Sequence, residues 1–173
     1  MGQESEILLQ SELFRVVRMW QRTDSGDRLT RSIVQHPGAV TILPLVDQER
    51  VCLIRNYRIA VGQTLIELPA GTLRKGEDPA LAARRELIEE TGYRADTLTP
   101  LCDFFMSPGI LDERMHLFVA AGLAPGEPAR EPGEQIDNLL LPWDEALRMV
   151  RDGAIQDAKT IVALLYYNMV RVE

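Results

Sequence analysis

The stretch GTLRKGEDPALAARRELIEETGY, residues 71–93, joins a glycine-flanked loop to a segment that carries three glutamates within five positions. Asp78 and Pro79 are typical of the N-cap and the first position of a helix, and Gly92 is typical of a helix end. We therefore expect a helix between Asp78 and Gly92, with the three glutamates in its second half.

A helical wheel at about 100° per residue separates an apolar face of this helix from an acidic one. The apolar arc, which we expect to pack against a sheet, consists of Ala80, Leu81, Leu87 and Ile88. Glu86, Glu89 and Glu90 fall on the other side, within about 100° of one another. The sequence thus places three carboxylates close together on one side of the helix.

Such a cluster destabilises a helix on its own. Glu86 and Glu90 are i, i+4 neighbours whose repulsion costs roughly a few tenths of a kcal/mol, and the helix dipole disfavours anions in the last turns. A divalent cation would offset both effects, and oxygen ligands without Cys or His nearby favour Mg²⁺ or Mn²⁺. Because Mg²⁺ usually keeps water and substrate phosphate as ligands, a phosphate-bearing substrate is expected. The alternative is a solvated acidic helix face.

The spacing of this stretch resembles the Nudix box, G-x5-E-x7-R-E-U-x-E-E-x-G-U, in which U is a bulky apolar residue. The fixed positions of that motif are filled by Gly71, Glu77, Arg85, Glu86, Glu89, Glu90 and Gly92. Leu87 and Tyr93 fill its first and last apolar positions. The resemblance implies an enzyme that hydrolyses a nucleoside diphosphate linked to another group X.

The resemblance also assigns roles to residues of this stretch. In the Nudix family, the carbonyl before the box glycine and the helix glutamates hold the metal ions. Carried over, the metal ligands are the backbone oxygen of Ala70, Glu86 and Glu90, with Glu89 close by. Arg85 is expected to orient a glutamate, and Glu77 is expected to brace the loop or the outer metal shell.

Segments outside the box resemble the ADP-ribose pyrophosphatase subgroup, from about Arg28 to Tyr167. They are HPGAV, RNYRIAVG, ELPAG, SPGILDE and DAKTIVALLYY. This likeness implies cleavage of ADP-ribose into AMP and a sugar phosphate. The alternatives are a hydrolase of another such compound, for example a nucleotide sugar or FAD, and a non-catalytic Nudix module that binds a nucleotide metabolite.

Several residues outside the box are candidate substrate ligands. Pro108, Gly109 and Glu113 match the subgroup, although a plain turn and a surface charge fit them equally well. Arg58 follows an apolar strand and is expected to bind a pyrophosphate oxygen, the alternative being a salt bridge to a nearby carboxylate. Arg28 and Arg31 are weaker candidates for the same anion.

The general base is the least defined part of the site. Relatives carry acidic residues in the loop that corresponds to AREPGEQIDN, residues 129–138. Glu134 is the first choice, followed by Glu131 and Glu89. The position two residues before Glu134 is often acidic in relatives but is Pro132 in this chain. A general base must also lie within hydrogen-bond reach of the attacking water, a distance that the sequence does not give.

Strand patterns dominate the chain before the acidic helix. A hairpin is expected around TDSGD, residues 23–27, and three further strands are expected before residue 71, the last over 64–71 and closed by Pro69 and Gly71. Later strands and two C-terminal helices complete a mixed α/β pattern. We expect a Nudix-type α/β/α sandwich with a mixed sheet over 37–173 and an N-terminal β-hairpin arm over 1–36.

The arm has a second expected use. In the subgroup that the chain resembles, such strands pair across a homodimer and contribute to the neighbour's site. Trp20 or Phe14 would then stack on adenine, although both residue types are more often part of a core. An ordinary edge strand is the alternative for this segment.

Composition and charge argue against some classes of protein. The net charge of −7 without a basic patch argues against a nucleic-acid surface. Apolar runs fall far short of the ~18 residues that span a bilayer, and MGQESEIL lacks a signal segment, so a cytoplasmic protein is expected. Cys52 and Cys102 are expected to be buried, reduced thiols, and His36 and His116 to be structural or surface residues.

Overall fold

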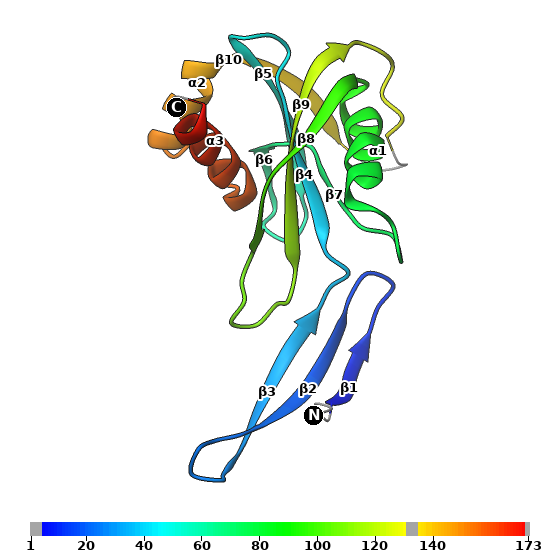
Figure 1. The fold of residues 1–173 in the computed structure, drawn as a ribbon, viewed down its shortest axis with the longest axis vertical. Helices are drawn as coiled ribbons and strands as arrows, with labels where there is room; N and C mark the ends of the chain where they lie inside the picture. The colour runs from blue at the N-terminus through cyan, green and yellow to red at the C-terminus, as the bar shows by residue number, and fades with distance from the viewer. Residues whose placement is uncertain (1–4, 131–134, 172–173) are drawn as a thin grey trace.

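The computed structural model describes residues 5–130 and 135–171, which form three sheets and three helices (Figure 1). The strands are β1 (Ser5–Gln10), β2 (Arg15–Arg22), β3 (Arg28–Gln35), β4 (Ala39–Pro44), β5 (Arg50–Arg58), β6 (Gln63–Glu67), β7 (Ala70–Thr72), β8 (Arg94–Phe105), β9 (Arg114–Ala124) and β10 (Ile136–Pro142). The helices are α1 (Pro79–Thr91), α2 (Trp143–Arg151) and α3 (Ala158–Val170). None of the described helices is long and apolar enough to cross a membrane.

The four-stranded sheet has the order β7-β4-β9-β8 and is mixed, because β4 and β9 run parallel while the other pairs are antiparallel. All six residues of β4 are buried, as expected for a strand that is covered on both faces. Val40 and Ile42 pack in a cluster with Leu87 of α1, whereas Leu43 packs in the core on the opposite face.

A second sheet, of order β10-β5-β6, lies with α2 and α3 on that opposite face. Leu53 of β5, Trp143 of α2 and Leu164 of α3 belong to one buried cluster with Leu43 and Leu117. Helices therefore cover both sides of the sheet layers, and the predicted α/β/α sandwich is confirmed (Figure 1).

Two predicted strands need correction. The single strand expected over 64–71 is two strands, β6 and β7, which belong to different sheets. Pro69 between them has no N–H for a ladder, and its carbonyl instead accepts the N–H of Ile42 at 2.9 Å. The expected N-terminal hairpin, β2 with β3, is present, but β1 joins it as a third strand.

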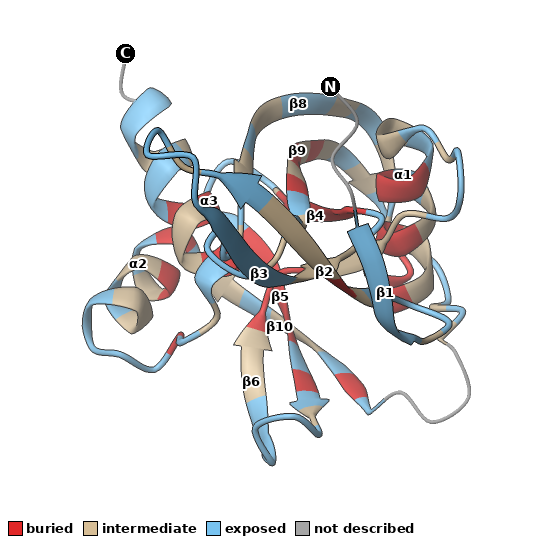
Figure 2. Cartoon of the chain, turned by 90° about the horizontal axis from the view of Figure 1, so that it is seen from below, coloured by how far each residue is buried: buried red, intermediate tan, exposed pale blue. Residues whose placement is uncertain are grey.

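The N-terminal sheet, β1-β2-β3, extends away from the sandwich and is mostly exposed (Figures 1 and 2). The end of β3 is held by the turn after β8: Val34 N–H donates to the Ile110 carbonyl at 2.8 Å, and Asp112 N–H donates to the Val34 carbonyl at 3.1 Å. His36 N–H donates to the Asp112 carboxylate at 2.7 Å. The segment SPGILDE thus attaches this sheet to the sandwich.

Helix α1 has the predicted caps. The Asp78 side chain accepts the N–H groups of Ala80 and Leu81, Pro79 is the first helical residue, and Gly92 adopts φ 80°, a conformation that glycine permits.

The face that α1 turns toward the sheet differs from the expected arc. Leu81 is 64% exposed, whereas Ala82 and Ala83 are fully buried and Glu86 and Glu90 are nearly so. The two small alanines let the helix approach β4 and β7 closely, which rolls the acidic side inward. The prediction that the glutamates face away from the sheet was therefore wrong for Glu86 and Glu90.

Candidate active site

Strand β7 meets two carboxylates of α1. Ala70 N–H donates to Glu90 Oε2 at 2.9 Å. A Cβ added at Gly71 would lie 2.0 Å from Cδ and Oε1 of Glu86, so a side chain at this position would require the Glu86 carboxylate to move. The Glu86 carboxylate therefore occupies the space that a side chain at position 71 would need. Two carboxylates, 9% and 4% exposed for Glu86 and Glu90, thus lie against consecutive residues of β7.

Arg85 connects the loop glutamate to the helix glutamates. Its Nε and Nη2 donate to the two oxygens of Glu77 at 3.0 Å each, which is a bidentate pair. Its Nη1 donates to Glu86 at 2.5 Å and to Glu89 at 2.9 Å. One guanidinium therefore donates hydrogen bonds to three carboxylates and holds the Glu86 side chain in place.

The pKa values of this network reflect the same contacts. The hydrogen bonds from Arg85, and then the one from the Arg74 N–H, lower the pKa of Glu77 from 4.5 to about 2. Hydrogen bonding to Glu77 in turn raises the pKa of Arg85 above its usual value. Both groups are therefore charged at neutral pH, and the loop before α1 is ionically fixed to the helix.

A cavity of about 340 Å³ opens over these carboxylates. Three glutamates and three arginines line it, together with smaller groups: Glu86, Glu89, Glu90, Arg58, Arg74, Arg85, Asn56, Leu13 and Ala70 to Thr72. A cavity lined by both carboxylates and guanidinium groups suits a metal ion at the carboxylates and phosphate oxygens at the guanidinium groups.

Arg58 has features of both predicted roles, the phosphate ligand and the salt-bridge partner. It lines the acidic cavity. Its Nε and Nη2 also donate to the two oxygens of Glu67 at 2.8 and 2.7 Å, so the salt bridge considered as the alternative is present. Nη1 is the remaining guanidinium nitrogen, and its contact with a phosphate stays a prediction.

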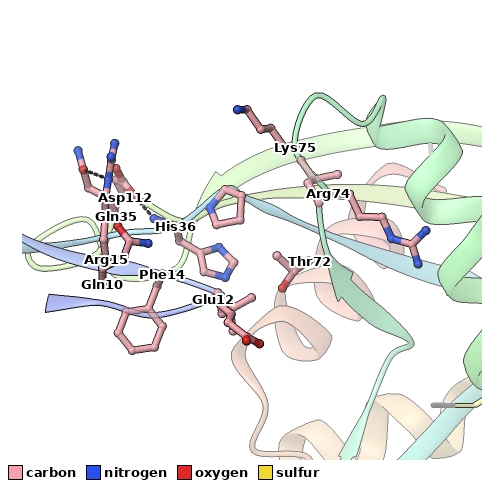
Figure 3. Close-up of a pocket in the computed structure, with 13 residues that line it drawn as sticks. Gln10, Glu12, Phe14, Arg15, Gln35, His36, Thr72, Arg74, Lys75 and Asp112 are labelled. Atoms are coloured by element: carbon pink, nitrogen blue, oxygen red, sulfur yellow. Dashed lines mark hydrogen bonds between the residues drawn. The ribbon is translucent and has the colours of Figure 1, made fainter. Parts of the chain in front are cut away.

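A second hollow, of about 660 Å³, adjoins the first and shares Leu13, Thr72 and Arg74 with it. It lies between the N-terminal sheet and the loop before α1. Figure 3 shows Phe14 and His36 on the side of the N-terminal sheet, with Thr72 and Arg74 on the other. Together the two hollows offer space for a molecule longer than a diphosphate.

Other predicted ligands lie elsewhere in this chain. Arg28 and Arg31 are on β3 and do not line the acidic cavity; Arg28 lies over the Trp20 ring at 4.5 Å. Pro108 and Gly109 form the exposed turn described above. Glu113 lies 3.6 Å from Nδ1 of His36.

Two of the three candidate bases, Glu131 and Glu134, lie outside the described residues, as does Pro132. The third, Glu89, lines the acidic cavity and is half-buried. Its role as a base stays a prediction.

The histidines and cysteines take no part in the acidic cavity. His116 Nδ1 lies 2.9 Å from Asp103, and His36 Nδ1 accepts the Gly38 N–H at 3.2 Å. Neither cysteine forms a disulfide, and burial raises the pKa of Cys52 to about 12.

The sequence did not single out Glu67, Lys159, Arg74 or Asn56, which surround or line the cavity. Glu67 lies within ELPAG and Lys159 within DAKTIVALLYY, two segments that carry the resemblance to the subgroup as a whole. Each of them is a charged residue inside an otherwise apolar strand or helix, and a charged side chain that is buried requires a partner. That pattern could have identified both residues from the sequence.

The donor set determines which metal fits. Among residues 5–130 and 135–171, no group of three or more His, Cys, Asp or Glu side chains is placed to hold a metal ion. The available donors are the hard carboxylate oxygens of Glu86 and Glu90, backed by Glu89. Mg²⁺ and Mn²⁺ take such oxygens, commonly one or two carboxylates completed by water and phosphate. The residues therefore fit a divalent ion that is shared with a phosphate substrate.

Comparison with known proteins decides the family. The NUDIX domain family matches residues 35–164, more than half of the chain. The chain belongs to the NUDIX family. Hydrolases of this family generally need a divalent metal ion.

The relatives include enzymes named for diphosphate cleavage. The chain is 39% identical to the ADP-ribose pyrophosphatase of Bacillus subtilis (strain 168) over 147 residues, 84% of this chain and 80% of that protein. It is 40% identical, with the same coverage, to the methanol dehydrogenase activator of Bacillus methanolicus. GDP-mannose pyrophosphatase of Escherichia coli O6:K15:H31 (strain 536 / UPEC) is 37% identical over 76% of this chain and 73% of its own length.

A solved structure agrees with these relatives. The crystal structure of an ADP compounds hydrolase superposes with a TM-score of 0.83 at 25% identity, covering 98% of this chain and 94% of that one. The predicted family, fold and class of enzyme, a pyrophosphohydrolase, are thereby confirmed.

The Glu77–Arg85 pair predicts how stability depends on pH. Because the folded pKa of Glu77 lies near 2 and its ordinary value is 4.5, the pair stabilises the fold above about pH 4.5 and loses that effect as pH falls toward 2. We expect Glu77→Gln to lower the unfolding temperature at pH 7. Below about pH 4.5, the unfolding temperature of this variant should fall less steeply with decreasing pH than that of the wild type. Thermal unfolding followed by circular dichroism from pH 7 to 2.5 measures both. A variant that declines as steeply as the wild type would contradict the assignment; Glu49→Gln, remote and exposed, is the control.

Proposed function

We propose that this chain hydrolyses the pyrophosphate linkage of a nucleoside diphosphate-X compound, with ADP-ribose as the first candidate, giving AMP and a sugar phosphate. One observation carries the proposal: two buried carboxylates lie against β7 in a cavity that arginines also line. The proposal adds Mg²⁺ or Mn²⁺ as the ion held there.

Each group at the cavity has a task in this reaction. Glu86 and Glu90 hold the ion, and Ala70 N–H and Arg85 keep their carboxylates in place. When bound, the ion supplies neutralisation of the diphosphate and acidification of a water molecule. Arg58 and Arg74 donate hydrogen bonds to phosphate oxygens, which orients the linkage over the carboxylates. Glu89 is the candidate, among the described residues, for accepting the proton of the attacking water.

The adjoining hollow holds one end of the substrate in this proposal. It carries an aromatic ring, Phe14, and cationic groups, Arg15 and Lys75, which suit a base or a sugar attached to phosphate. The shared residue Arg74 lies where the two hollows meet.

Hydrolysis of a nucleotide sugar is the second candidate. It is favoured by the match to GDP-mannose pyrophosphatases at 37% identity. FAD hydrolysis and a non-catalytic nucleotide-binding module remain outcomes that the following test separates.

The direct test is release of nucleoside monophosphate from ADP-ribose, GDP-mannose and FAD in the presence of Mg²⁺. We expect AMP from ADP-ribose at the highest kcat/KM, and Glu90→Gln to lower it roughly a hundredfold or more because a carboxylate at the metal is lost. Glu49→Gln, an exposed carboxylate between β4 and β5, is the control and should keep wild-type activity. Tight ADP-ribose binding without turnover would support the binding module, and preference for GDP-mannose would support the second candidate.

The proposal includes a homodimer formed through the N-terminal sheet. All residues of β1 are exposed, and Ile7 and Leu9 are 56% and 50% exposed, which leaves apolar side chains and a strand edge in solvent. Arg28 and Arg31 lie on the same sheet and, through such pairing, would reach the partner's cavity. A cytoplasmic location, with no nucleic acid or membrane as partner, is also part of the proposal.

Sedimentation equilibrium tests the dimer. We expect the wild type to sediment as a dimer at micromolar concentration and Ile7→Lys with Leu9→Lys to sediment as a folded monomer, because two charges oppose burial of this surface. Arg28→Ala should then reduce activity in the dimer and leave that of the monomer unchanged. A monomeric wild type at tens of micromolar would refute the dimer.

A further inference from the structure

A buried ionic cluster joins the start of α3 to the end of β6. Lys159 Nζ donates to Glu67 Oε2 at 2.6 Å and to Asp157 Oδ1 at 2.8 Å. The side chains of Lys159, Glu67 and Asp157 are 8%, 1% and 11% exposed. Charges so far from water carry a large desolvation cost and often contribute little to stability. A role beyond stability is therefore worth seeking for this cluster.

The cluster reaches the acidic cavity through one carboxylate. Glu67 uses both of its oxygens to bind Nε and Nη2 of Arg58, and Arg58 lines the cavity. Lys159 thus contacts the carboxylate that holds a cavity arginine, without lining the cavity itself. Burial by itself would raise the pKa of Glu67, but the hydrogen bonds of Arg58 and the charge of Lys159 lower it below its usual value. Glu67 is therefore ionised when it holds Arg58.

Lys159 affects Arg58 in two ways. Its bond to Oε2 fixes the plane of the Glu67 carboxylate, and with it the direction of the Arg58 fork. Its positive charge also partly neutralises the Glu67 carboxylate. Without Lys159, the full negative charge of Glu67 would act on Arg58 and weaken the attraction of that guanidinium for phosphate. Asp157, which balances Lys159, caps α3 by accepting the Thr160 N–H at 3.0 Å.

The same turn of α3 holds the backbone that leads to β7. Thr160 Oγ1 accepts the Leu68 N–H at 2.7 Å and donates to Asp157 at 2.6 Å. Leu68 and Pro69 connect Glu67 to Ala70, whose N–H binds Glu90. The start of α3 therefore fixes both the cavity arginine and the strand under the acidic residues.

We propose that Lys159 is a positioning residue that acts through Glu67 to present Arg58 to the diphosphate of the substrate. This proposal rests on the proposed function, because it assigns the Arg58 guanidinium to substrate binding. It predicts that the loss of Lys159 weakens substrate binding only while Arg58 is present.

A double-mutant cycle tests this coupling. The wild type, Lys159→Met, Arg58→Ala and the double variant are compared for KM and kcat with ADP-ribose and Mg²⁺, alongside their unfolding temperatures. We expect Lys159→Met to raise KM roughly tenfold with a smaller change in kcat, and to have no further effect on KM when Arg58 is already alanine. Arg151→Met, which removes an exposed charge on α2 (74% exposed), is the control and should match the wild type.

A purely structural role gives a different result. It would lower the unfolding temperature and the active fraction, and so kcat, by the same factor in both backgrounds, with KM unchanged. Equal effects of Lys159→Met with and without Arg58 would overturn the proposal.

Failure of the proposed function is recognised separately. If the wild type hydrolyses none of the three substrates, the same four proteins are titrated with methylenediphosphonate and Mg²⁺ by calorimetry. Coupling between Lys159 and Arg58 in that binding supports the positioning role without turnover. Additive effects, or no binding by the wild type, refute it.

Discussion

The site depends on the close approach of helix α1 to the short strand β7. Gly71 has no side chain, and Ala82 and Ala83 are small, so the helix lies near enough for Glu86 and Glu90 to contact consecutive strand residues. Two carboxylates one helical turn apart repel each other, and burial strengthens that repulsion. The fold accommodates them because the Ala70 N–H and Arg85 supply hydrogen bonds, and because hard oxygens in this arrangement suit a divalent cation.

Cations at the cavity are themselves fixed by carboxylates that lie outside the acidic pair. Arg85 is held by Glu77 from the loop before α1, and Arg58 is held by Glu67, which Lys159 supports from α3. Charged groups that are oriented before the substrate arrives need little reorganisation during reaction, which is the main source of electrostatic catalysis. The C-terminal helix thereby takes part in the site although none of its residues lines the acidic cavity.

Much of this was predictable from local sequence patterns. Asp78 and Gly92 predicted the ends of α1, and the fixed spacing of the motif identified its glutamates. Both signals are local, because they involve residues that are close in the sequence. The roll of α1 was not predictable, because a helical wheel ranks Leu81 above Ala82 by hydrophobicity, whereas in the fold Ala82 is buried in the cluster with Val40 and Leu81 is exposed. Glu67 and Lys159 are 92 positions apart, and only the tertiary fold brings them together. Strand β1 was missed because its residues are exposed and show no buried face.

Binding of Mn²⁺ to Gly71→Ala, followed by electron paramagnetic resonance, tests most directly whether the carboxylates lying against β7 form the metal site. The added methyl group would meet the carboxyl end of the Glu86 side chain, so that carboxylate must move while the fold persists. We predict that the affinity for Mn²⁺ falls about tenfold or more with little change in unfolding temperature. Wild-type affinity in a folded Gly71→Ala protein would contradict this account.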